Sequence, residues 1–256
     1  MTSALIFEDD ADWDVRIKDQ LRDFALSSQA LLQPLSSNPS SYADPTYPVP
    51  QDPAEKPPEL SFDRLPSTMA PKISPYGDGW DLLWIGHCGM KFPRFPGKDI
   101  PKGKVIRTDH TVPQKQYLET VSNPDELKNQ YPDHTRIVHH VQEGICSLVY
   151  GVSQAGARKL LYELGIHNKL TAYDIALRQF CEGTQGKRYH NCLTVRPSLF
   201  HHHRPVGPMS SESDIQAHGS GYRKVAKTPV VRYSTRMNWE KLLDGRTDFE
   251  DQWPDK

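Results

Sequence analysis

The chain alternates short apolar runs with segments in which apolar side chains recur every three or four residues. Residues 4–7 and 80–86 are apolar runs typical of buried strands. Helical spacing over 17–28 predicts a helix soon after the first strand, with Asp12 or Asp14 as its N-cap. Because the first run resembles a strand from the middle of a sheet, we expect that sequence encoding earlier strands has been lost.

The second half of the chain continues this alternation. The pattern predicts strands over 135–141, 146–152 and 188–199 and helices over 153–161 and 172–181. The polar residues 142–144 would join the first two of these strands, and Ser153 would cap the helix that follows. Since strands and helices alternate, we expect a three-layer α/β domain.

Proline is concentrated in one stretch. Nine of the 22 prolines lie within residues 34–70. Because proline fixes φ and cannot donate a backbone hydrogen bond, this stretch predicts a surface insert with little regular structure. Residues 90–112 are expected to form a loop. The domain would span 1–205, and 206–256 would form a polar C-terminal extension with one amphipathic turn at 237–243.

The composition allows a core and excludes two classes of protein. Hydrophobic residues make up 36% of the chain, and its apolar runs are far shorter than the ~20 residues that cross a membrane. The 31 basic and 32 acidic residues balance and form no basic stripe, so we expect no nucleic-acid partner. The start of the chain has neither the charged region nor the long apolar region of a secretory signal.

The four cysteines, Cys88, Cys146, Cys181 and Cys192, include no C-x-x-C pair. A structural zinc site is therefore not expected. A Cys181–Cys192 disulfide is conceivable in an oxidising compartment, but we expect four buried free thiols.

Five carboxylates occupy the seven positions from Glu8 to Asp14, directly after the first predicted strand. Ligands of α/β sheets bind beyond the carboxyl ends of strands. Strand alternation would point Glu8 and Asp10 to one side, where two carboxylates suit Mg²⁺ or Mn²⁺. The alternative interpretation is an acidic helix N-terminus that complements the helix dipole. An EF-hand loop is excluded, because Val15 stands where that loop needs glycine.

Four segments resemble motifs of one known family. They are Ala4-Leu-Ile-Phe-Glu-Asp-Asp10 with its E-D-D ending, Trp80-Asp-Leu-Leu-Trp-Ile-Gly86, residues 149–161, and Tyr173-Asp174 at the start of a helix. In this order, over residues 4–205, they make the chain similar to glycosyltransferase family 25. This family comprises bacterial lipooligosaccharide and collagen galactosyltransferases, and the chain most resembles its fungal members.

The resemblance implies a fold and a reaction. The fold would be a GT-A-like three-layer α/β sheet that lacks its first βαβ portion and carries the proline-rich insert. The enzyme would use Mn²⁺ or Mg²⁺ and transfer a hexose, with galactose as the expected sugar, from a UDP-sugar. The acceptor would be a hydroxyl of a saccharide or glycoprotein, and the transfer would invert the anomeric centre. Relatives work in the secretory pathway, whereas the sequence itself leaves the compartment open.

The same resemblance assigns roles to particular residues. Asp10, supported by Glu8, would hold the metal and with it the donor diphosphate. Of the three histidines after the last strand we favour His203 as a further metal ligand, because imidazole can bind Mn²⁺. His87, at the end of the second strand, would line the same cleft and contact the donor. Asp174 would be the base that deprotonates the acceptor hydroxyl.

Two other functions stay open. An inactive remnant of such an enzyme would act as a binding module for carbohydrate or for a partner chain. A metal-dependent phosphohydrolase would instead use Asp10 and Asp12 as a D-x-D pair.

Overall fold

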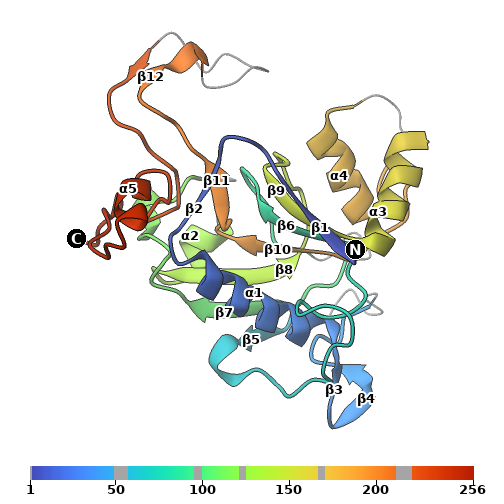
Figure 1. Cartoon of the computed structure of the whole chain (residues 1–256). Helices are drawn as coiled ribbons and strands as arrows, with labels where there is room; N and C mark the ends of the chain where they lie inside the picture. Colours follow the sequence, from blue (N-terminus) through green and yellow to red (C-terminus); the bar gives the residue numbers. More distant parts are fainter. Residues whose placement is uncertain (1, 49–56, 95–99, 121–124, 167–170, 212–220) are drawn as a thin grey trace.

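The computed structural model describes all residues except 1, 49–56, 95–99, 121–124, 167–170 and 212–220. In the described part of the chain, nine strands form one mixed sheet (Figure 1). Its main path runs in the order β1 (Ser3–Phe7), β9 (Val149–Ser153), β6 (Leu82–Gly86), β10 (Cys192–Arg196), β8 (Thr135–His140), β7 (Lys104–Thr108) and β5 (Glu59–Ser61). Off this path, β2 (Ala11–Trp13) pairs with β11 (Phe200–His202), which also pairs with the end of β6.

The helices and the smaller strand pairs lie around this sheet. The α-helices are α1 (Ile17–Leu32), α2 (Glu126–Gln130), α3 (Gln154–Leu160), α4 (Tyr173–Glu182) and α5 (Trp239–Leu243). Residues Leu161–Ile166 continue α3 as a π-helical turn, and short 3₁₀ turns occupy Phe62–Arg64, Lys115–Tyr117 and Met209–Ser211. Among the described residues, two small two-stranded sheets pair β3 (Pro34–Leu35) with β4 (Asn38–Tyr42) and β12 (Gly207–Pro208) with β13 (Tyr222–Arg223). None of the helices in the described ranges has the length and apolar character needed to cross a membrane.

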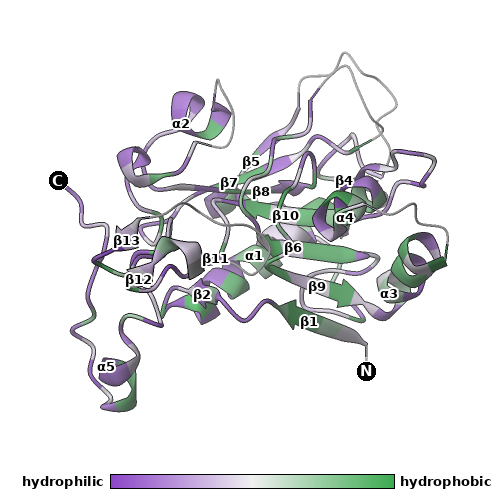
Figure 2. Cartoon of the chain, turned by 90° about the horizontal axis from the view of Figure 1, so that it is seen from above, coloured by the Kyte–Doolittle hydropathy of each residue, from purple (hydrophilic) through white to green (hydrophobic). Residues whose placement is uncertain are grey.

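Helices cover both faces of the sheet (Figure 1). Along β6, Leu83 and Ile85 belong to the core that includes α1. Leu82 and Trp84, on the opposite face, belong to the core that includes α4. Figure 2 shows hydrophobic residues concentrated in the central strands β6, β9 and β10. The mixed α/β fold expected from the sequence is confirmed, and the two-residue alternation along β6 explains how one strand serves two cores.

The first strand differs from its prediction. β1 lies at one end of the sheet order and pairs antiparallel with β9, and most of its residues are exposed. Leu5 and Phe7 keep 49% and 46% of their surface accessible. The expectation of a buried inner strand is wrong for this structure, because an apolar run fits an edge strand and an inner strand equally well.

The proline-rich stretch and the predicted loop both contain strands. Within 34–70, β3 and β4 form a hairpin, and β5 joins the main sheet by parallel pairing with β7. β7 itself lies within 90–112, where only a loop was expected. Both expectations are wrong in this respect, because pairing with a distant strand stabilises segments whose local sequence signal is weak. Residues 49–56 lie outside the described part.

The strand–helix pattern of the second half is largely confirmed. α3, α4 and β10 fall within or close to their predicted ranges, and the Ser153 hydroxyl caps α3 by accepting the Gly156 N–H (2.9 Å). β8 and β9 are not neighbours, however, because β10 and β6 lie between them. The predicted caps of α1 are also wrong: its N-cap is Arg16, with no side-chain cap.

The described part of the chain includes all four cysteines, which form the disulfides Cys88–Cys146 and Cys181–Cys192, so none of them is free. Their Cα atoms are 5.4 and 5.5 Å apart. The expectation of four free thiols is therefore wrong. Cys88 and Cys146 are 58 residues apart, so only the fold could reveal that they meet.

Part of the segment after Pro205 returns to the sheet domain. Val230 and Val231 are buried, and Ser234 forms a backbone bridge with Asp14. A short helix, α5, lies where the amphipathic turn was predicted, but none of its residues is buried.

Candidate metal-binding site

The acidic turn after β1 lies beside β11. Residues 8–10 form the turn, and β2 then pairs antiparallel with β11 so that its first residue is opposite His202. The backbone N–H of His203 donates to the carbonyl of Asp10 (2.8 Å), which extends the contact into the turn. This strand pairing brings the acidic segment and the histidine segment together although they lie far apart in the sequence.

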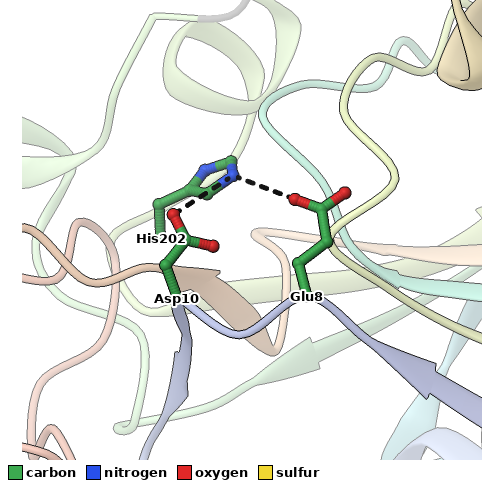
Figure 3. A group of neighbouring side chains, drawn as sticks. All are labelled: Glu8, Asp10 and His202. Atoms are coloured by element: carbon green, nitrogen blue, oxygen red, sulfur yellow. Dashed lines mark ion pairs between the residues drawn. The ribbon is translucent and has the colours of Figure 1, made fainter. Parts of the chain in front are cut away.

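Glu8, Asp10 and His202 converge, and we call them the carboxylate–histidine site (Figure 3). Nε2 of His202 is 3.7 Å from Oε2 of Glu8 and 4.0 Å from Oδ2 of Asp10. One potential ligand atom from each residue lies within 4.8 Å of the other two. The Glu8 and Asp10 side chains are 44% and 35% exposed, so solvent and solutes can reach them.

Neighbouring groups hold these side chains in place. The Ser147 hydroxyl donates to Oε1 of Glu8 (3.0 Å), and the Glu8 N–H donates to the Leu148 carbonyl (2.9 Å). Arg204 Nη1 is 3.4 Å from Oδ2 of Asp10. Each carboxylate therefore has a partner besides His202.

The charge state of His202 suits metal binding. Burial lowers the pKa of its imidazole and Arg204 acts in the same direction, while Asp10 and Glu8 oppose the shift. Near pH 7 the ring is therefore neutral, and one of its nitrogens offers a lone pair. Carboxylate oxygens suit Mn²⁺ and Mg²⁺, and imidazole is an acceptable further ligand for Mn²⁺. The donor set fits the cation that the sequence resemblance implies.

The structure places His203 and Asp12 apart from this site. His203 Nδ1 lies 3.0 Å from the Thr228 hydroxyl and 3.6 Å from Oδ2 of Asp12. The histidine that meets Glu8 and Asp10 is thus His202, whereas the sequence analysis favoured His203. Successive side chains of a strand point to opposite sides, so adjacent histidines reach different partners.

Asp12 is fully buried in a hydrogen-bond network. Its carboxylate accepts hydrogen bonds from the hydroxyls of Thr228 and Ser234 and from the Arg236 N–H. Burial alone would raise the Asp12 pKa, but these bonds and His203 outweigh it and lower the pKa. A buried carboxylate with these partners cannot attack a phosphate ester together with Asp10, so the geometry does not support the phosphohydrolase alternative.

His87 also lies outside the carboxylate–histidine site. It is buried, its Nε2 is 2.9 Å from the Val195 carbonyl, and burial lowers its pKa to about 4. With Arg196 and His201 it lines a small cavity of about 30 Å³. The structure therefore places His87 at this small cavity and not among Glu8, Asp10 and His202.

Asp174 lies in the first turn of α4. Its Oδ2 accepts the Cys146 N–H (2.9 Å) and its Oδ1 accepts the Ile175 N–H (2.8 Å). The carboxylate is half-buried and fixed in orientation. It is linked to the carboxylate–histidine site through the loop that contains Cys146 and Ser147.

Sequence reasoning included His202 among three candidate histidines but favoured His203, and it missed Ser147 and Arg204. His202 carried a signal, since the three adjacent histidines were recognised, but choosing among them required knowledge of the β2–β11 pairing. Ser147 is 139 residues from Glu8, and nothing in its local sequence indicates the contact.

Comparison with known proteins adds no further information. Neither a scan against protein-family models nor searches of curated proteins and solved structures found a match for this chain.

Proposed function

We propose that the protein is a metal-dependent glycosyltransferase that transfers a hexose from a UDP-sugar to a hydroxyl of a saccharide or glycoprotein. The observation that carries this proposal is the convergence of Glu8, Asp10 and His202 where the partly exposed turn after β1 lies beside β11. The sequence resemblance supplies the donor class and galactose as the expected sugar. A GT-A-like assignment of the fold belongs to the same proposal, and the mixed α/β sheet is compatible with it.

The proposed roles follow from the chemistry of the side chains. Glu8 and Asp10 would supply carboxylate oxygens and His202 an imidazole nitrogen to Mn²⁺ or Mg²⁺. The cation would neutralise the donor diphosphate and favour departure of the nucleoside diphosphate. Arg204 contacts Asp10 and therefore adds a guanidinium beside the carboxylate–histidine site. A guanidinium pairs well with phosphate oxygens.

We assign the acceptor base to Asp174. In an inverting transfer, the acceptor oxygen bonds to the anomeric carbon as the bond from that carbon to the nucleoside diphosphate breaks. The hydroxyl proton passes to a carboxylate. Asp174 is a suitable candidate because two backbone N–H groups fix its orientation at the start of α4.

The cellular setting is also a proposal. Disulfides form and persist in oxidising compartments and are rare in the cytosol. The two disulfides therefore support a location in the secretory pathway, where relatives in glycosyltransferase family 25 work.

The first test compares Asp10→Asn with Asp9→Asn. Both variants change one carboxylate of the same turn, but only Asp10 belongs to the carboxylate–histidine site. Calorimetric titration of UDP in the presence of Mn²⁺ should show binding by the wild type and Asp9→Asn and its loss in Asp10→Asn. UDP binding that needs no metal, or equal binding by both variants, would contradict the proposal. Metal-dependent binding without release of UDP from UDP-galactose would favour the binding-module alternative.

The second test concerns Asp174→Asn. The asparagine oxygen can still accept the Cys146 N–H but cannot take a proton from an acceptor. We expect unchanged Mn²⁺-dependent UDP binding and a loss of transfer of about 10²-fold or more, the usual contribution of a general base. If UDP binding falls as much as transfer, Asp174 is not the base and instead supports the loop.

A further inference from the structure

The Cys88–Cys146 disulfide lies against the carboxylate–histidine site. Cys88 follows β6, Cys146 lies in the loop before β9, and both are partly exposed. The Cys181–Cys192 disulfide joins α4 to β10 in the core, and each of its cysteines is 1% exposed. The chain therefore contains one disulfide at the site and one in the core, which makes their roles directly comparable.

The site disulfide contacts one side of the His202 ring. Nδ1 of His202 is 3.6 Å from Sγ of Cys88, while Nε2 faces Glu8 and Asp10. When a cation lies between Nε2 and the two carboxylates, the ring proton is on Nδ1, where it faces Sγ of Cys88, a weak hydrogen-bond acceptor. The lone pair on Nε2 is then directed at the cation. A partner on the second ring nitrogen is how proteins usually orient a metal-binding histidine.

The same disulfide anchors the loop that holds Glu8. Ser147 follows Cys146 and donates to the Glu8 carboxylate, and Leu148 accepts the Glu8 N–H. Cys146 has a positive φ of 62°, a conformation that costs a non-glycine residue free energy and persists only when its surroundings impose it. The bond to Cys88 ties this residue to the end of β6.

We propose that the Cys88–Cys146 disulfide positions His202 and Glu8 for the cation, so that its opening weakens metal binding. This inference rests on the proposed function, since it concerns the same site. The opening step is exchange with a dithiol reductant. The two sulfurs of the reductant form a disulfide, and the two electrons and two protons that they give up convert Cys88 and Cys146 to thiols. Cys88 can then move away from the ring, and the loop loses its covalent link to β6.

The experiment compares matched disulfide deletions. Mn²⁺ is titrated into the metal-free wild type, Cys88→Ala/Cys146→Ala and Cys181→Ala/Cys192→Ala, each below its own melting temperature. We expect Mn²⁺ affinity to fall by about tenfold or more in the first variant, the usual effect of removing a group that orients a ligand. The core-disulfide variant should bind Mn²⁺ like the wild type.

Two further measurements separate positioning from loss of stability. In the Cys181→Ala/Cys192→Ala background, a dithiol can open only the site disulfide, and reoxidation should restore Mn²⁺ affinity. With Mg²⁺ bound, the ¹⁵N chemical shifts of His202 should indicate the Nδ1–H tautomer, and they should shift toward those of the metal-free ring when the disulfide is opened. Both measurements can still be made if Cys88→Ala/Cys146→Ala does not fold.

The outcomes distinguish this inference from the function on which it rests. If the wild type binds no Mn²⁺, the proposed function fails and this inference fails with it. If the wild type binds Mn²⁺ and opening the site disulfide leaves the affinity and the His202 tautomer unchanged, only the inference is overturned. Equal weakening by both disulfide deletions would also overturn it, because the effect would then be one of general stability.

Discussion

Adjacent residues have different partners at the end of the sheet. His202 meets Glu8 and Asp10, whereas its neighbour His203 meets Asp12 and Thr228. The Glu8 and Asp10 side chains of the first group are partly exposed to solvent. The second group is a buried network in which the Asp12 carboxylate accepts several hydrogen bonds. One residue position therefore separates a candidate site from a structural network.

Replacement of these two histidines is expected to affect two different quantities, Mn²⁺ affinity for His202 and stability for His203. His202→Gln removes an imidazole nitrogen from the carboxylate–histidine site, and we expect Mn²⁺ affinity to fall by about tenfold or more with little change in stability. His203→Gln disturbs the Asp12 network, so we expect a loss of about 1–3 kcal/mol in the free energy of unfolding and unchanged Mn²⁺ affinity. Calorimetry and urea denaturation measure the two quantities. A stronger effect of His203→Gln on Mn²⁺ binding would restore the prediction made from sequence.

At the scale of elements, close packing of α3 on the sheet depends on Gly156. α3 starts directly after β9, and a Cβ at Gly156 would lie 2.1 Å from the carbonyl oxygen of Asp81, just before β6. The obstacle is backbone, which cannot rotate away as a side chain can. The helix can therefore approach β6 this closely only because residue 156 is glycine.

Gly156→Ala should accordingly destabilise the protein more than a similar change nearby. We expect a loss of about 2–3 kcal/mol in the free energy of unfolding, because α3 or the start of β6 must shift. The matched control is Gly151→Ala in β9, where the added Cβ would meet Leu83 at an ordinary 3.6 Å. Urea denaturation compares the two variants. Equal stability of both would show that α3 does not pack against the Asp81 backbone as described.

At the scale of the whole molecule, buried histidines make stability depend on pH. Burial lowers the pKa of His87 to about 4 and those of His140 and His201 to about 3. In the unfolded chain a histidine has a pKa near ~6.5. Below that pH the unfolded state takes up protons that the folded state does not. The stabilisation is therefore complete above the unfolded pKa and is lost as the pH falls toward the folded values.

We expect the free energy of unfolding to fall steeply between pH 6.5 and 4.5. Each of the three histidines can contribute a slope of up to about 1.4 kcal/mol per pH unit. His140→Gln should reduce the slope by about one such share, while the exposed His110→Gln should leave it unchanged. Denaturation curves at several pH values measure this slope of the free energy of unfolding against pH. An unchanged slope in His140→Gln would show that this ring is not held neutral by burial.

The sequence by itself determined the features that depend on neighbours along the chain. The apolar alternation of β6, the Ser153 cap of α3, the α/β pattern and the acidic turn after β1 could all be predicted. Local chemistry suffices for these because side-chain direction, capping and helix propensity act over a few residues. The sequence also predicts Glu8 and Asp10 on one side, but by strand alternation, whereas in the structure both lie in the short turn after β1.

Only the tertiary structure decided which distant segments meet. In the structure, β1 is an edge strand, and β5 and β7 belong to the main sheet. Cys88 is bonded to Cys146, and His202, not His203, contacts the acidic turn. Each of these depends on strand pairing or loop closure between segments far apart in the sequence. Such contacts are selected by the packing and hydrogen bonding of the whole sheet, and a local pattern is compatible with more than one of them.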